Sequence, residues 1–280
     1  ANGDVYICGT TYESTADSNN CILRKYNGTS GSLVWSVQFN GASSRHDGWA
    51  DICIAKNRIC VTGSSWNNST QYNVLTICYD TLGNSIWQKE FDYTGQFDGG
   101  VRISYKKKGN AFVVAAGGQN GVNNFDYLTL LYRFQNGQQS GPNVSTGSQN
   151  GFDEIADITT DTLGNIYVTG GAFGYTGFDY LTVKMDSALT GLWFATYSSA
   201  GILNDKAKSI VVDDEGGVYV TGYATKSGSG ADYITIKYST NGTELWRDSF
   251  NGAGNGGEIM ISGKRMYSIF LFSKRKMAYQ

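Results

Sequence analysis

The 280-residue chain repeats itself about every 52 residues, and this repeat constrains its fold more than any other feature of the sequence. A period of this length is typical of solenoids and propellers. Four short patterns recur in a fixed order and are clearest in residues 153–197. In that stretch they occupy residues 156–158, 164–170, 179–184 and 192–197.

The second and fourth patterns define the units. The second pattern is an aromatic residue or cysteine followed by a short run that usually ends in glycine, and its copies begin at Tyr6, Cys60, Phe112, Tyr167 and Tyr219, with a degraded copy at Tyr267. The fourth pattern is a tryptophan with an aromatic residue four positions later, and only the third unit lacks it. That unit holds the only proline, Pro142, which suits an exposed edge strand that need not donate every backbone hydrogen bond.

Each pattern is short, rich in Val, Ile, Thr, Tyr and Trp, and bounded by Gly, Asn, Asp or Ser, as β-strands are. No apolar i, i+3, i+4, i+7 pattern persists, so helix is close to absent. Four strands per unit predict an all-β fold, a β-propeller of four-stranded antiparallel blades. We predict one domain over residues 1–262, with units starting near residues 1, 50, 100, 154 and 206, and an extra strand or tail over residues 263–280.

Closure of the ring is the open question, because the sequence starts at a second strand. Residues 258–262 resemble a first strand that completes the opening blade, which favours a ring of five blades because a shared strand removes an exposed edge. A further strand over residues 265–272 would instead give six blades, and a third alternative is a piece of a larger ring.

Residues 164–197 contain the run Gly-Asn-x-Tyr-Val-Thr-Gly, Asp-Tyr-x-Thr-x-Lys and Leu-Trp-x-x-x-Tyr, which resembles the bacterial family named for its seven-bladed β-propeller repeats. The resemblance extends from residue 1 to about residue 262. It implies a propeller fold in a secreted or cell-surface bacterial protein, and it carries over no catalytic residues. The chain departs from the family in holding only about five units and in its degraded last copy.

Composition excludes several function classes. Twenty-two basic residues nearly cancel 24 acidic ones, which argues against a nucleic-acid binder that works through bulk charge. The single histidine, His46, excludes a multi-histidine metal site, and no cofactor-binding fingerprint appears in the required setting. No signal peptide is visible, and no apolar run is long enough to span a membrane. We expect no cofactor, and the oligomeric state is left open.

The five cysteines lie in the first third of the chain, at Cys8, Cys21, Cys53, Cys60 and Cys78. They are expected to be mostly small buried thiols. One pair stands apart, because a hairpin that turns at residues 56–57 would set Cys53 opposite Cys60. Cysteines in that position can be close enough to form a disulfide.

Two sets of polar residues accompany the first strands. Four aspartates recur five positions before the first isoleucine of these strands, at Asp47, Asp98, Asp153 and Asp205. They are either weak candidates for repeated cation sites or caps that bind backbone amides of their own loops, and capping is favoured because no calcium-loop motif accompanies them. A second set, directly before the same isoleucines, includes Asp51, Arg102 and Asp157. These residues are candidates for ligand binding near the axis.

The links from second to third strands and from fourth to next first strands are long, and in a meander both sets emerge on one face. Aromatic residues in these links are candidates for contacts with a ligand: Trp49, Trp66, Phe97 and Tyr175, with Tyr12, Tyr93 and Phe178 nearby. The sequence therefore predicts a non-catalytic extracellular scaffold or binding module for a protein or glycan. The alternative is a hydrolase or lyase with an acidic site at the central channel, formed by Asp51, Asp157 and Arg102.

Overall fold

The structure, a computed structural model, describes residues 3–12, 19–41, 45–122, 124–147, 149, 151–175, 177–199, 204–226 and 230–251. These residues form five antiparallel sheets, in each of which the strands pair in chain order. The first sheet has three strands, β1 (Val5–Tyr12), β2 (Asn19–Tyr26) and β3 (Leu33–Phe39). The other sheets have four strands each: β4 (Asp47–Ala55), β5 (Arg58–Asn67), β6 (Gln71–Tyr79) and β7 (Ser85–Phe91); β8 (Asp98–Lys106), β9 (Ala111–Gln119), β10 (Phe125–Arg133) and β11 (Gln139–Ser145); β12 (Glu154–Thr160), β13 (Ile166–Gly174), β14 (Gly177–Met185) and β15 (Gly191–Tyr197); β16 (Asp205–Val212), β17 (Val218–Lys226), β18 (Gly230–Tyr238) and β19 (Glu244–Phe250).

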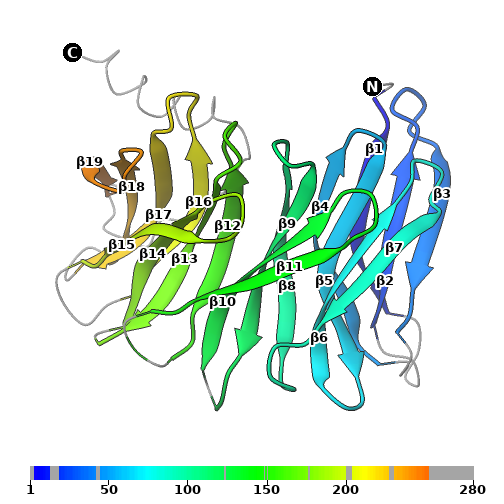
Figure 1. Cartoon of the computed structure of the whole chain (residues 1–280), viewed down its shortest axis with the longest axis horizontal. Helices are drawn as coiled ribbons and strands as arrows, with labels where there is room; N and C mark the ends of the chain where they lie inside the picture. Colours follow the sequence, from blue (N-terminus) through cyan, green and yellow to red (C-terminus); the bar gives the residue numbers. More distant parts are fainter. Residues whose placement is uncertain are drawn as a thin grey trace.

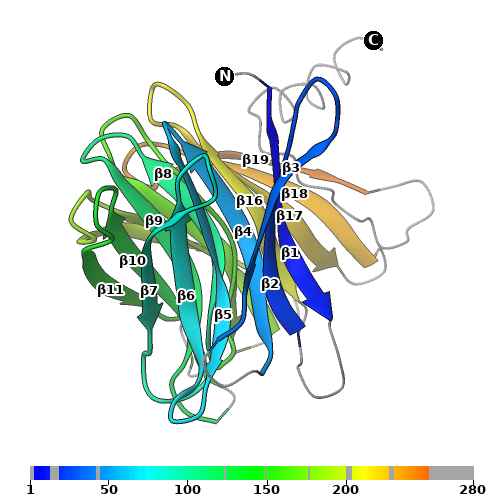
Figure 2. The same cartoon turned by 90° about the vertical axis from the view of Figure 1, so that its right-hand side faces the viewer.

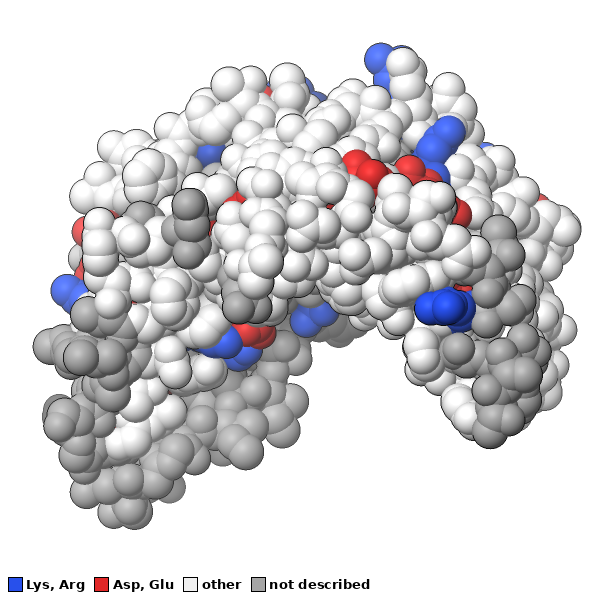
Figure 3. Space-filling model, turned by 90° about the horizontal axis from the view of Figure 1, so that it is seen from below, with Lys and Arg blue, Asp and Glu red and all other residues white. Residues whose placement is uncertain are grey.

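Each sheet corresponds to one predicted unit. The all-β prediction is confirmed, and four of the five described sheets have the four antiparallel strands predicted for a blade. The first strands contact one another in series, β4 with β8, β8 with β12 and β12 with β16. Figures 1 and 2 show the sheets following one another around a curve, with the first sheet at one end and the last at the other. The described part of the chain is therefore an arch, hollow on one side (Figure 3). The strand predicted at residues 258–262 and the tail at 263–280 lie outside the described residues, and so does any closure through them.

The links from second to third strands are shorter than predicted. Residues 64–71 were expected to form a loop, yet β5 and β6 continue to pair there, with Ser65 opposite Asn73 and Trp66 opposite Tyr72. The polar residues Ser65 and Asn73 are buried in the ladder, which continues to a tight hairpin tip at Asn67 and Gln71. The face that the sequence assigns to long links, which we call the hairpin face, thus carries the ends of strands as well as loops.

A bulge in the first strand explains the glycine that ends the second-strand pattern. The register between β12 and β13 shifts between Ile155 and Asp157, and the carbonyl of Glu154 then fills the space where a Cβ of Gly170 would lie. Gly63 and Gly222 face the carbonyls of Gly48 and Lys206 in the same way. Any side chain at these positions would push the first strand away.

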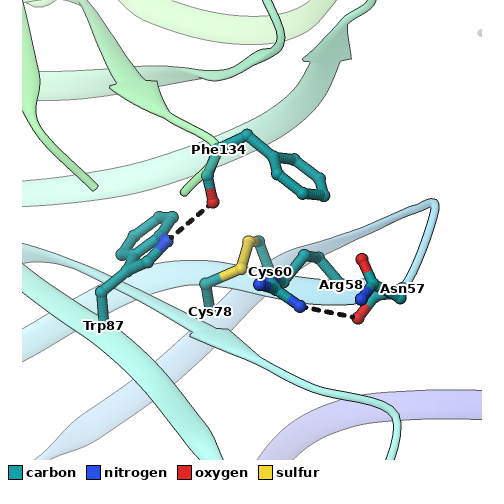
Figure 4. Close-up of a disulfide and its surroundings, with 6 residues drawn as sticks. All are labelled: Asn57, Arg58, Cys60, Cys78, Trp87 and Phe134. Carbon is teal, nitrogen blue, oxygen red and sulfur yellow. Dashed lines mark hydrogen bonds between the residues drawn. A yellow bond between two sulfur atoms is a disulfide. The ribbon is translucent and has the colours of Figure 1, made fainter. Parts of the chain in front are cut away.

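A tryptophan on the outer strand of one sheet docks on the next sheet. The indole N–H of Trp87 on β7 donates to the carbonyl oxygen of Phe134 at 3.3 Å (Figure 4). The indole ring stacks on Tyr132, with 5.8 Å between the ring centroids. The turn below it needs Gly137, because its φ is 64° and a Cβ there would lie 2.6 Å from the indole ring. Equivalent contacts join Trp35 to Thr81 and Gly83, and Trp193 to Thr240, Gly242 and Tyr238.

The third sheet lacks this tryptophan, and the fourth sheet has different residues at the positions that would contact it. Leu189 stands at the glycine position of the turn, with a φ of 70°, and Met185 stands at the tyrosine position. The side chain of Leu189 is buried, and the amide of Asn143 on β11 donates to its carbonyl oxygen at 3.1 Å. β11 is an edge strand, as predicted, and the structure places Pro142 at a bulge in it.

The cysteine pairing differs from the prediction. The hairpin turns at residues 56–57 and sets Cys53 opposite Cys60, as expected, but the disulfide joins Cys60 to Cys78 (Figure 4). β5 lies between β4 and β6, so Cys60 has an in-register cysteine on both sides, and the bond forms with the one on β6. Cys53 takes no part in this disulfide, and Cys8 and Cys21 are free thiols.

Candidate functional site: an aromatic belt on the hairpin face

Six aromatic rings follow one another across the second, third and fourth sheets. Successive ring centroids are 4.9, 4.9, 5.8, 4.8 and 6.4 Å apart. In order, the rings belong to Trp66, Tyr72, Phe97, Phe125, Phe152 and Phe178, which we call the aromatic belt. All six lie at or next to strand ends on the hairpin face, so the belt crosses two boundaries between sheets.

The belt is partly open to solvent and carries a cation at each end. Phe97 is 39% exposed and Phe152 is 43% exposed. The guanidinium of Arg45 lies 5.0 Å from the ring of Trp66, and the ammonium of Lys206 lies 3.8 Å from the ring of Phe178. Lys206 also pairs with Glu154 at 2.5 Å, which fixes its position. Figure 3 looks onto this face, where most side chains are uncharged and charges gather at a few places.

Buried aspartates hold the strand ends that carry the belt. Asp98 accepts hydrogen bonds from the backbone N–H groups of Tyr93 (2.6 Å) and Gln119 (3.2 Å), so it joins the chain entering β8 to the end of β9. Asp153 accepts from Gly147 (2.7 Å) and Phe173 (2.8 Å) in the same way. Asp47 and Asp205 repeat the arrangement. Each carboxylate is thus a cap between loops, as the capping interpretation predicts.

These carboxyl groups are buried, which is unusual for a group that can carry a charge. All four are at most 3% exposed, and burial raises the pKa of Asp98 and of Asp153 to about 6. Burial also raises the pKa of Asp205. Within the described residues, no group of three His, Cys, Asp or Glu side chains is placed to hold a metal ion. The observed partners of the four aspartates are backbone amides.

A short bridge fixes the centre of the belt. The N–H of Phe125 donates to the carbonyl of Gly151 at 2.9 Å, and the N–H of Asp153 donates to the carbonyl of Phe125 at 2.8 Å. Phe125 and Phe152 therefore form a parallel bridge between the third and fourth sheets, and their rings lie 4.8 Å apart. The spacing of these two rings is set by the backbone.

The aromatic residues predicted from the loops divide into three groups. Trp66, Phe97 and Phe178 belong to the belt. Tyr175 is 85% exposed at the tip between β13 and β14, outside the stack of rings. Trp49 is only 9% exposed and packs against Phe39 at 6.2 Å in the core below the loops, so it presents no free ring.

The residues expected in the links did not include Tyr72, Phe125 and Phe152, although these stand where strands begin or are about to begin, as Phe97 and Phe178 do. A signal was present. Four belt members directly precede an aspartate and one precedes an asparagine at the start of a first or third strand: Phe97-Asp98, Phe125-Asp126, Phe152-Asp153, Phe178-Asp179 and Tyr72-Asn73. This dipeptide couples a ring on the hairpin face to a polar residue that enters the sheet.

Of the three candidate residues near the axis, Asp51 and Asp157 contact the next sheet. The carboxylate of Asp51 accepts from the N–H of Ile103 on the next sheet at 3.0 Å. Asp157 is buried and accepts from the hydroxyl of Ser209 (2.9 Å) and the N–H of Ile210 (3.1 Å) on the next sheet. Arg102 donates to the carbonyl of Val101. A hollow of about 160 Å³ beside Asp157 is lined by Ser104, Thr159 and Ser209, among others.

The succession of antiparallel sheets around an inner row of first strands defines a β-propeller fold. Solved structures with this fold are similar to the chain: a quinohemoprotein alcohol dehydrogenase from Pseudomonas putida HK5 (TM-score 0.58, 10% identity, 89% of this chain and 52% of that one), a quinohemoprotein alcohol dehydrogenase from Comamonas testosteroni (0.53, 13%, 93% and 44%) and the polysaccharide lyase Uly1 (0.52, 11%, 92% and 73%). The chain spans about half the length of the two dehydrogenases.

At these identities the likeness shows the fold alone. Neither a family model nor a curated protein sequence matches the chain. In the part that the structure describes, no helix is long and apolar enough to cross a membrane.

Proposed function

We propose that the chain is a non-catalytic binding module that holds a glycan or a protein on the aromatic belt. The observation that carries this proposal is the belt itself, a continuous row of partly exposed rings with Arg45 and Lys206 at its ends. Single exposed apolar residues are normal on a protein surface, but contiguous patches rimmed by polar groups mark interaction sites.

The belt is suited to binding because it is organised in advance. Rigid rings lose little conformational entropy when a ligand orders them, and two backbone-set features, the aspartate caps and the bridge between Phe125 and Phe152, already fix the ring positions. Aromatic faces and neighbouring amide or hydroxyl groups offer contacts both to the apolar faces of sugars and to protein side chains.

We further propose a bacterial extracellular or cell-surface location and membership in the seven-bladed β-propeller repeat family. The repeat motifs support the family. The disulfide between Cys60 and Cys78 supports the location, because such bonds persist in oxidising compartments. We do not extend the proposal to a hydrolase or lyase, because the carboxylates of Asp51 and Asp157 already bind backbone groups of the next sheet.

A glycan array and a pull-down from a bacterial cell envelope test the proposal, followed by titration of whatever binds. Phe97→Ala and Phe152→Ala should each weaken binding by about tenfold or more, the typical cost of truncating a central interface aromatic residue. Phe194→Ala is the matched control, because Phe194 is 74% exposed on β15 and outside the belt. Silence in both screens, or an equal loss in the control variant, would contradict the proposal.

A further inference from the structure

The contacts between consecutive sheets use a repeated knob and hole. The knob is the outer-strand tryptophan of one sheet, and Trp87 represents it. The hole belongs to the next sheet and has three parts: a tyrosine at the end of the third strand (Tyr132), a glycine in the following turn (Gly137) and a carbonyl oxygen of that turn. Among the described sheets, the knob fills the hole from first to second, second to third and fourth to fifth sheet.

The first sheet carries an empty hole of the same construction. Its turn between β2 and β3 is closed by a hydrogen bond from Gly31 N–H to Asn27 carbonyl at 2.9 Å, as Gly137 is bonded to Arg133 at 2.8 Å. The φ of Gly31 is 69°, close to the 64° of Gly137, and Tyr26 ends β2. No described atom lies within 4 Å of a Cβ built on Gly31, whereas the indole of Trp87 covers Gly137.

The last described sheet carries a free knob. Trp246 on β19 is 44% exposed, compared with 7% for Trp87. Its ring contacts Tyr219 of its own sheet at 6.1 Å, and its indole N–H has no acceptor among the described residues. Phe250, four residues on and therefore on the same face of β19, is 52% exposed, so this face of the outer strand presents two aromatic side chains.

The composition of a hole follows the presence of a knob. Where the third sheet lacks a tryptophan, the fourth sheet has Met185 and Leu189 in place of the tyrosine and glycine. The first sheet retains Tyr26 and Gly31, the combination that elsewhere receives a tryptophan. The side of β1 that carries Gly9 is open as well, because a Cβ there would meet no described atom, whereas the equivalent Gly63 faces the carbonyl of Gly48 on the first strand of its own sheet. The first sheet is therefore built to receive another sheet of this repeat.

We infer that Trp246 of one copy of this chain docks in the hole formed by Tyr26 and Gly31 of a second copy. The occupant is a second copy because the knob and the hole lie at opposite ends of the arch, with the hollow between them (Figures 1 and 3). The contact is head to tail, so each copy uses one surface as knob and a different one as hole, and repetition gives a ring or an open chain of copies. It also covers Val5 and Ile7 of β1, which are 50% and 54% exposed.

Sedimentation velocity over a range of protein concentrations tests the contact with two variants. Trp246→Ala removes the knob, and Gly31→Asn fills the hole with a residue that tolerates positive φ. The wild-type protein should gain mass with concentration, and each variant alone should remain a monomer. An equimolar mixture should give a dimer and nothing larger, because Gly31→Asn still offers a knob and Trp246→Ala still offers a hole.

Far-ultraviolet circular dichroism and melting curves establish that both variants fold, and Leu82→Ala, at a residue 74% exposed in a turn of the second sheet, is the control that should associate like the wild type. A wild-type protein that stays monomeric at all concentrations would overturn the inference. Docking of Trp246 on Gly31 within one chain would give that result. Association that survives Trp246→Ala, or a mixture that forms no dimer, would also overturn it.

Discussion

Trp87 and Trp246 occupy equivalent positions on the outer strands of two sheets, yet only Trp87 is docked. Trp87 is 7% exposed, stacks on Tyr132 and donates to Phe134, so Trp87→Ala should destabilise the fold by about 4 kcal/mol, the usual cost of truncating a buried aromatic side chain. Trp246→Ala, made at a concentration where the protein is monomeric, should cost only about 1 kcal/mol, because its ring is 44% exposed and contacts Tyr219 of its own sheet.

Urea unfolding monitored by circular dichroism measures both changes in the free energy of unfolding. Trp87→Phe separates the contributions at the docked site. It keeps most ring contacts and loses the indole N–H, which leaves the carbonyl of Phe134 without this donor and should cost about 1 to 3 kcal/mol. Equal losses for Trp87→Ala and Trp246→Ala would refute the docking argument, because the two residues share a strand position and differ only in whether the next sheet covers them.

Three further predictions concern the framework. Leu189→Gly relieves a positive φ worth about 1 to 2 kcal/mol but removes a buried leucine worth about 2 to 5 kcal/mol, so it should lower stability in urea; a more stable variant would show that strain dominates at this turn. Burial raises the pKa of Asp98 and of Asp153 to about 6 in the folded state, above the ordinary value near 4. Between pH 4 and 6 the folded state therefore binds more protons than the unfolded state, and the free energy of unfolding falls as the pH rises through that window. The fall in melting temperature from pH 4 to 6 should be smaller in Asp98→Asn, and an unchanged slope would exclude this carboxyl as its source. Reducing the disulfide between Cys60 and Cys78 should cost about 3 kcal/mol, from the entropy of the loop that it closes, and Cys53→Ser should leave that difference unchanged.

The sequence predicted the sheets because their signals are local and repeated. Strand patterns such as that beginning at Tyr167 recur at a nearly constant spacing, and hairpin turns such as residues 56–57 carry their own turn chemistry. The disulfide was harder to predict, since Cys60 has a cysteine in register on each side and only the three-dimensional sheet decides between them. The arch could not be predicted for the same reason. Its curvature depends on how each tryptophan packs against the next sheet, which is a contact between distant parts of the sequence.

The aromatic belt shows why a binding site is harder to predict from the sequence than a fold. Three constraints account for most of the repeat: glycines facing a bulge, tryptophans seated in holes and aspartates that cap loops. None of them requires an aromatic residue immediately before the capping aspartate, and the equivalent positions of the second and fifth sheets are His46 and Asn204. Phe97 and Phe152 therefore satisfy no packing rule of the repeat, and they remain about two-fifths exposed at considerable hydrophobic cost. Residues that the framework does not need, placed side by side across its sheets, are best explained by contact with something outside the chain.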